Sequence, residues 1–73
     1  MLEINRIDFR YRLENENVLL AYQVINHRMY FFKGNTKKYI ENKLKEKESS
    51  LDKKYIDYLL NEGILIGGKK GEI

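Results

Sequence analysis

The hydrophobic pattern of this chain changes its period once, at Gly34. Before this residue, the pattern is that of strands, and in residues 7–13 the apolar side chains recur at every second position, the spacing of a strand with one buried face. After it, they recur at the three-to-four-residue spacing of an amphipathic helix. A chain with strands first and helices second is typical of the α+β class, so the sequence predicts an α+β fold.

Three strands are expected ahead of the helical region. Residues 7–13 alternate apolar and charged side chains, which predicts a half-exposed strand. Residues 18–25 are apolar at nearly every position, which predicts a central strand covered on both faces. Residues 28–33 form the third strand. The connections at residues 14–17 and 26–27 are short and polar, so we expect a three-stranded antiparallel meander.

Two helices are expected after the strands. Asn35 or Thr36 is expected to cap the first helix with its side-chain oxygen. Ser49 is expected to begin the second helix, with Asp52 in the position of a capping box. Gly63 is well placed to end that helix in the left-handed conformation.

The two predicted helices share a sequence. The tetrapeptide KKYI occurs at residues 37–40 and again at residues 53–56, so both helices carry the same apolar face. Helices this short are marginal alone and must pack on another surface. We therefore expect an αα-hairpin that packs on one face of the sheet, in a winged-helix-like arrangement.

The length of 73 residues predicts one domain, which we place at residues 1–66, with residues 64–66 docked on the core. Residues 67–73 are expected to be a mobile C-terminal tail. The absence of Cys excludes disulfides and thiolate metal sites. A domain this small is expected to gain further stability from a partner chain or a ligand, so a homodimer is a candidate.

The composition also bears on location and partners. No apolar run approaches the roughly 20 residues of a membrane-spanning helix. The N-terminal sequence MLEINRIDF lacks the apolar region of a secretory signal, so we expect a cytoplasmic protein with no membrane partner. Acidic residues are interspersed among 14 Lys and Arg, so nucleic acid is a less favoured partner.

The sequence carries no pattern typical of catalysis. His27 is the single histidine, and it lies at a predicted hairpin tip without an acid–base partner. None of the motifs HExxH, GxGxxG, GxxxxGK[ST] or GxSxG occurs. We therefore expect no enzymatic activity, no metal, no cofactor and no small-molecule substrate.

The third strand is the main candidate for binding. Its segment Met29-Tyr30-Phe31-Phe32 is apolar on both faces, although the meander places it at a sheet edge. An unpaired apolar edge promotes aggregation unless the helices, a second copy or a partner peptide covers it. Arg28 and Lys33 flank the segment, as gatekeepers against nonspecific pairing or as attractants for an acidic peptide.

Three local patterns share the order of a known family. They are an apolar segment after the polar turn, a third strand that runs into a polar helix start, and a last helix that ends in Leu-x-x-x-Gly-apolar-Leu. The matching residues are Val18, Leu19 and Leu20; Tyr30 through Thr36; and Leu59, Gly63, Ile64 and Leu65. In this combination, residues 6–66 resemble the precursor-peptide recognition element of ribosomal-peptide biosynthesis, the domain type of the small chaperone in pyrroloquinoline quinone synthesis. The family usually carries three helices after its sheet, whereas this chain has room for two.

The resemblance implies a mode of peptide binding. In the family, the leader segment of a precursor peptide adds as a strand to the third strand, in the groove beside the last helix. The implied wall of that groove includes Leu59, and Lys53 would add to its preference for an acidic leader. The implied partner-binding residues are Arg28, Met29, Tyr30, Phe31, Phe32, Lys33, Lys54, Tyr55 and Tyr58.

Two other classes stay open. The first is a winged-helix-like nucleic-acid binder, with residues 52–61 as its recognition helix and a steep salt dependence of DNA binding as its signature. This helix offsets Lys53 and Lys54 with Asp52 and Asp57. The second is a small homodimeric protein of the phage or plasmid type, whose apolar edge strand serves self-association.

Overall fold

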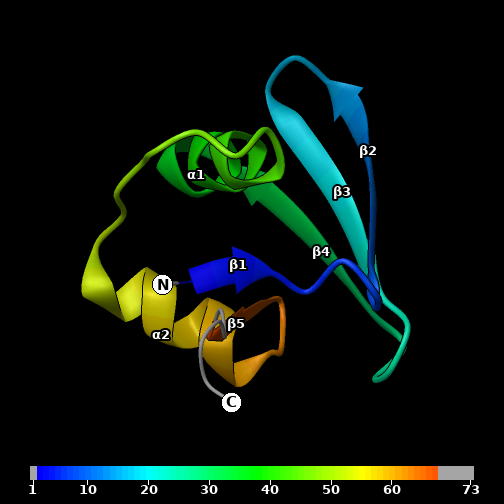
Figure 1. Cartoon of the computed structure of the whole chain (residues 1–73). Helices are drawn as coiled ribbons and strands as arrows, with labels where there is room; N and C mark the ends of the chain where they lie inside the picture. Colours follow the sequence, from blue (N-terminus) through cyan, green and yellow to red (C-terminus); the bar gives the residue numbers. More distant parts are fainter. Residues whose placement is uncertain (1, 68–73) are drawn as a thin grey trace.

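The structure is a computed structural model of the chain, and it describes residues 2–67. A three-stranded antiparallel sheet, two helices and a two-stranded ribbon make up the fold, which confirms the predicted α+β class (Figure 1). The elements in chain order are β1 (Leu2–Ile4), β2 (Phe9–Asn15), β3 (Val18–Gln23), β4 (Arg28–Lys33), α1 (Gly34–Leu44), α2 (Lys53–Asn61) and β5 (Leu65–Gly67).

The predicted meander is the sheet of β2, β3 and β4, with β3 in the middle. β4 has the predicted bounds, whereas β2 begins after Ile7 and β3 ends before Ile25. Both isoleucines lie outside the strands and are exposed. The connection between β3 and β4 spans residues 24–27 rather than the predicted 26–27. Within it, the Asn26 side chain accepts from the Arg28 N–H (3.0 Å), and His27 adopts φ +58°.

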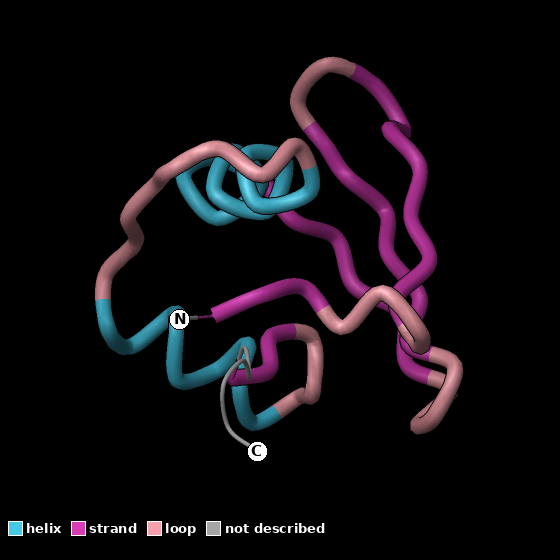
Figure 2. The backbone as a smooth tube through the Cα atoms, in the orientation of Figure 1, coloured by secondary structure: helices cyan, strands magenta, loops and turns pink. Residues whose placement is uncertain are grey.

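The central strand β3 is covered on one face rather than on both. Leu19, Ala21 and Gln23 are fully buried, while the alternate residues Leu20 and Tyr22 are half-buried. Figure 2 shows why: both helices lie on the same side of the three-stranded sheet. The opposite face is therefore apolar in sequence and uncovered in the structure.

The predicted helix caps are wrong, because both helices begin elsewhere than expected. α1 starts directly after β4, with Lys33 as its N-cap, so Asn35 and Thr36 already lie in its first turn. α2 starts after Asp52, and the Ser49 hydroxyl accepts from Asn42 Nδ2 (3.2 Å) instead of a helix N–H. Within residues 2–67, neither N-cap residue makes a side-chain capping bond.

The end of α2 follows the prediction. Gly63 has φ +79°, as expected for a left-handed C′ residue. Its N–H donates to Leu60 O (3.1 Å), and the N–H of Ile64 donates to Leu59 O (3.0 Å). These two bonds form a Schellman motif, which satisfies the last carbonyl groups of the helix.

A two-stranded ribbon closes the fold and was not predicted. β1 pairs antiparallel with β5, so Leu2 lies opposite Gly67 and Ile4 opposite Leu65. The predicted docking of residues 64–66 takes the form of this ribbon. Of the predicted mobile tail, Gly67 belongs to β5, and residues 68–73 lie outside the described residues.

The core lies between the sheet, the ribbon and the helices. α1 packs against β1, β3 and β4, and α2 packs against β5. The buried apolar residues are Ile4, Phe9, Leu19, Ala21, Tyr30, Phe32, Tyr39, Ile40, Leu59, Ile64 and Leu65.

The repeated tetrapeptide is used differently in the two helices. Tyr39 and Ile40 in α1 are buried, whereas their counterparts in α2 are exposed (Tyr55) and half-buried (Ile56). α2 therefore packs one edge of its apolar face and leaves its tyrosines at the surface.

Candidate functional site

β4 has one open edge. Within residues 2–67, β4 pairs with β3 alone. No described strand pairs with its other edge, which faces α2 (Figure 1). In an antiparallel pair, alternate residues of an edge strand turn their N–H and C=O groups away from the neighbouring strand. The open edge of β4 can therefore accept another strand.

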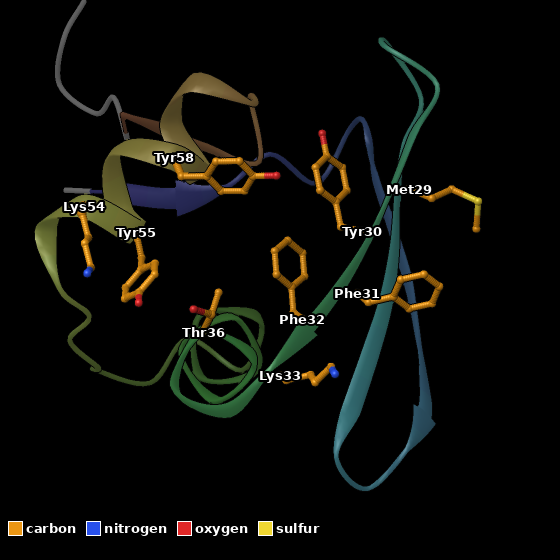
Figure 3. A pocket seen from close by; sticks show the side chains of 9 residues that line it. All are labelled: Met29, Tyr30, Phe31, Phe32, Lys33, Thr36, Lys54, Tyr55 and Tyr58. Carbon is orange, nitrogen blue, oxygen red and sulfur yellow. The ribbon is translucent and has the colours of Figure 1, made fainter.

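A groove of about 700 Å³ lies between this edge and α2 (Figure 3). Its volume is within the roughly 300–1,000 Å³ that is common for ligand pockets. The lining residues are Met29, Tyr30, Phe31, Phe32, Lys33, Thr36, Lys54, Tyr55 and Tyr58. Eight of the nine residues that the sequence suggested are thus brought together, and Thr36 of α1 joins them.

The side chains of β4 divide between two surfaces. Tyr30 and Phe32 point into the groove, where their rings stack with centroids 5.6 Å apart and planes 6° apart. Met29 and Phe31 point away from it and are 60% and 65% exposed (Figure 3). The sequence reasoning assigned all four to one edge, but the alternation of a strand separates them.

α2 supplies the opposite wall of the groove. Tyr55 and Tyr58 are three residues apart, so they lie on one face of the helix, and both are partly exposed. Lys54 places its ammonium 5.1 Å from the centroid of the Tyr55 ring, within range of a cation–π interaction. The fully buried Leu59 belongs to the core behind this wall.

Arg28 does not line the groove but helps to fix its width. Its Nη1 donates to both carboxylate oxygens of Glu62 (3.0 and 3.2 Å), just beyond the end of α2. Tyr30 donates its hydroxyl to Glu62 Oε1 (2.7 Å), and Gln23 donates from Nε2 to Glu62 O (3.2 Å). These four residues, which we call the Glu62 cluster, hold the end of α2 against the sheet.

The Glu62 cluster also affects the tyrosines of the groove. Burial, and then the hydrogen bond to Glu62, raise the pKa of the Tyr30 phenol. Burial, and then the negative charge of Glu62, raise the pKa of Tyr58. Both phenols are neutral near pH 7. The Tyr30 hydroxyl already donates to Glu62, so the Tyr58 hydroxyl is the one that can donate to a partner.

The groove itself is positively charged. Of the lining residues in the described chain, the charged ones are Lys33 and Lys54, and both are cations. Lys53, on the same helix, forms an exposed ion pair with Asp57 (2.9 Å) instead. A bound segment that carries carboxylates is therefore favoured over a basic one.

Sequence reasoning missed two parts of this site. Glu62 stands 34 residues after Arg28, and no local pattern indicates such a pairing. Thr36 was expected as a helix cap, but the start of α1 at Gly34 makes it a groove residue.

No metal site or membrane helix is found in the described part of the chain. No group of three or more His, Cys, Asp and Glu side chains in residues 2–67 could hold a metal ion. Neither helix there is long and apolar enough to span a bilayer. Comparison of the sequence and the structure with protein-family models, curated proteins and solved structures finds no match.

Proposed function

We propose that this protein is a non-catalytic binding module that takes up an extended partner peptide as a fourth strand beside β4. The observation that carries the proposal is the open edge of β4, which runs along an aromatic groove with α2 as its far wall. The leader segment of a ribosomally made precursor peptide is the proposed ligand, since the order of elements resembles the recognition domains for such leaders.

The backbone and the side chains of the bound peptide would make different contacts. Its backbone would hydrogen-bond to β4, which supplies affinity without regard to sequence. Alternate side chains would enter the groove and contact Phe32, Tyr55 and Tyr58, which supplies specificity. The segment should therefore carry apolar residues at positions i and i+2, with carboxylates near Lys33 or Lys54.

The affinity expected from these contacts is micromolar. Each backbone hydrogen bond contributes about 1 kcal/mol net. Each apolar anchor that becomes fully buried contributes roughly 1.5–3 kcal/mol. Four such bonds and two anchors contribute roughly 7–10 kcal/mol, and ordering the peptide opposes part of this gain. Reaching the −8.2 kcal/mol or so of a 1 μM complex therefore also needs a carboxylate at Lys33 or Lys54.

The nucleic-acid alternative has weaker support. A recognition helix needs exposed cations for phosphate contacts. On α2, however, Lys53 is paired with Asp57, and Lys54 lies over the Tyr55 ring. The side chains that α2 presents to the groove are mainly tyrosines, which suit a peptide better than a phosphate backbone.

The first test is a binding titration. Fluorescein-labelled synthetic peptides that cover the short open reading frames beside the gene would be titrated by fluorescence anisotropy. We expect one segment to bind at micromolar concentration, and Tyr58→Ala to weaken it by about tenfold or more, because a central aromatic anchor is lost. Tyr11→Ala is the matched control, since Tyr11 is 52% exposed on β2, away from the groove.

A second arm tests strand addition itself. Peptides N-methylated at alternate amides would be made in both registers, because the amides that face β4 are every second one. Methylation in one register should abolish binding, whereas methylation in the other should leave it nearly unchanged. Equal effects in both registers, or no binding by any peptide of the panel, would refute the proposal.

A further inference from the structure

The three-stranded sheet has a second surface that the helices leave uncovered. Its residues alternate along each strand with those that face the core. We call this surface the outer face. It consists of Arg10, Arg12 and Glu14 on β2, Val18, Leu20 and Tyr22 on β3, and Met29, Phe31 and Lys33 on β4.

The outer face is apolar across two strands. Phe31 and Met29 are among the most exposed large apolar residues of the described chain, and the half-buried Leu20 and Tyr22 lie directly opposite them in the register. A contiguous apolar patch of this kind marks an interaction site, whereas single exposed apolar residues do not.

The register of the sheet arranges this face in rows. One row runs Arg12–Leu20–Phe31. A parallel row runs Arg10–Tyr22–Met29. Each of these two rows therefore carries a cation on β2, a half-buried residue on β3 and an exposed apolar residue on β4.

A third row carries opposite charges at its two ends. Val18 is paired with Lys33 on one side and with Asn15 on the other, next to the irregular position of Glu14. Arg12 Nε donates to Glu14 Oε1 (3.2 Å), so Glu14 lies on the same face as Arg12. The third row thus carries an acid on β2, Glu14, and a base on β4, Lys33.

We infer that the outer face binds the outer face of a second copy, about a two-fold axis parallel to β3. Such an axis places β2 of each copy over β4 of the other, and β3 over β3. Each row then lies opposite the same row of the second copy, in reversed order. Leu20 then meets the partner subunit's Leu20, Arg12 lies over the partner subunit's Phe31, and Glu14 faces the partner subunit's Lys33. The third row is self-complementary in charge, and the first row pairs a cation with an aromatic ring.

The contacts predicted by this arrangement are favourable ones. A guanidinium over an aromatic ring is attracted by the negative face of the ring, and more strongly when it is desolvated. The Arg12 guanidinium would serve here, since Arg10 is held by backbone carbonyls, including Ile7 O at 2.9 Å. Two sheets that pack face to face with their strands nearly aligned form a β-sandwich, in which side chains of the two inner faces interdigitate.

Other occupants fit the outer face less well. A two-fold axis perpendicular to the strands would place the β2 cations of one copy over those of the other. A nucleic acid would meet Glu14 beside Arg12, and the rings of Phe31 and Tyr22 lie in different rows, with Leu20 and Met29 opposite them. Met29, Phe31 and Lys33 line the β4 side of the groove and also belong to the outer face, whereas Tyr55 and Tyr58 line the groove alone. The inference does not rest on the proposed function, because the outer face is uncovered whatever the groove binds.

The test is sedimentation equilibrium over a wide concentration range. We expect the wild type to be a dimer and Leu20→Lys to raise the dimer Kd by about a hundredfold or more, because two ammonium groups would meet at the axis. β3 is paired on both sides, so this substitution leaves the β4 edge intact. Tyr58→Ala, in the groove, is the control and should dimerise like the wild type.

A charge exchange identifies the geometry. Glu14→Lys and Lys33→Glu should each raise the dimer Kd by about tenfold, since each ion pair occurs twice across the axis. The double variant should recover the wild-type Kd, although β3 separates the two residues within one chain. This arm does not require that Leu20→Lys folds, and circular dichroism checks each variant.

Three results would overturn the inference. They are a monomeric wild type at the highest concentration, a dimer that survives in folded Leu20→Lys, and a double charge exchange without recovery. A dimer that survives Leu20→Lys would assign self-association to another surface, such as the β4 edge.

Discussion

Gly63 is the residue on which the position of Glu62 depends. Its φ of +79° allows the chain to turn away at the end of α2, directly after the glutamate that holds Arg28 and Tyr30. An L-residue in this conformation brings its Cβ close to its own carbonyl oxygen. At Gly63 a Cβ would also lie 3.4 Å from Gln23 Nε2, within the Glu62 cluster.

We expect Gly63→Ala to lower the free energy of unfolding by about 1–2 kcal/mol, from backbone strain. Gly34→Ala should lose less, because Gly34 also has a positive φ but open space around its Cβ position. Gly67→Ala is the control, with neither feature. Urea denaturation measures all three, and equal losses at Gly63 and Gly67 would contradict this explanation.

Tyr30 links the stability of the fold to alkaline pH. Burial and the Glu62 carboxylate raise the pKa of its phenol in the folded state, so folding favours the protonated form. This contribution to stability is complete below the unfolded-state pKa of about 10, and it is lost as the pH rises toward the folded value. The loss follows from the phenolate lying beside a carboxylate in a buried site.

Urea denaturation of the wild type and Tyr30→Phe between about pH 8 and 11 tests this linkage. We expect Tyr30→Phe to be less stable at pH 8, because Arg28 becomes the remaining side-chain donor to the Glu62 carboxylate. Above pH 10 or so, the wild type should lose stability faster than the variant. Parallel curves would contradict the linkage, because they would show that the pKa of Tyr30 is the same in the folded and unfolded states.

At the scale of elements, the two helices show how one sequence serves two purposes. Ile40 in α1 has no exposed surface, whereas Ile56 at the same place in the repeat is half-buried. The difference arises because α1 packs on three strands, while α2 packs on the ribbon strand β5 and borders the groove. Sequence similarity therefore indicated two helices but not their unequal burial.

We expect Ile40→Ala to cost about 2–5 kcal/mol of unfolding free energy, as is usual for a fully buried large-to-small substitution. Ile56→Ala should cost clearly less, since its side chain keeps some contact with solvent. Thermal denaturation of the two variants gives the comparison. Equal costs would show that α2 is packed as tightly as α1.

The elements that periodicity can indicate were predicted, and those it cannot were missed. In β4, four apolar residues stand between Arg28 and Lys33, and the bounds of the strand agree with the prediction. β1 and β5 have three residues each, which is too short to show a period, and each requires a partner more than sixty residues away. The helix starts were misplaced because a polar side chain at the right spacing does not ensure a cap.

At the scale of the whole molecule, local patterns predicted some residues of the candidate site and missed those that depend on distant partners. Tyr55 and Tyr58 could be placed beside the third strand from the resemblance and from helical spacing. Glu62 could not, because its partners Arg28 and Tyr30 come near it only when the tertiary fold places the end of α2 beside β4. Nor did apolarity on both faces of residues 18–23 show that the helices would cover one face alone.

The side chains of β4 alternate between two surfaces of the molecule. Tyr30 and Phe32 belong to the groove, and Met29 and Phe31 belong to the outer face. Peptide uptake uses the edge and the groove side, whereas the inferred sandwich uses the outer face. A dimer of this kind would carry two open grooves on its flanks.

The ribbon of β1 and β5 also bears on how the chain folds during its synthesis. Residues 2–4 leave the ribosome early, yet their strand partners are residues 65–67. Until these are made, Ile4 has no strand beside it, and the loop that must close spans nearly the whole described chain. The meander can form from local contacts much earlier. During synthesis we therefore expect a stage in which the three-stranded sheet has formed and residues 2–4 are still unpaired.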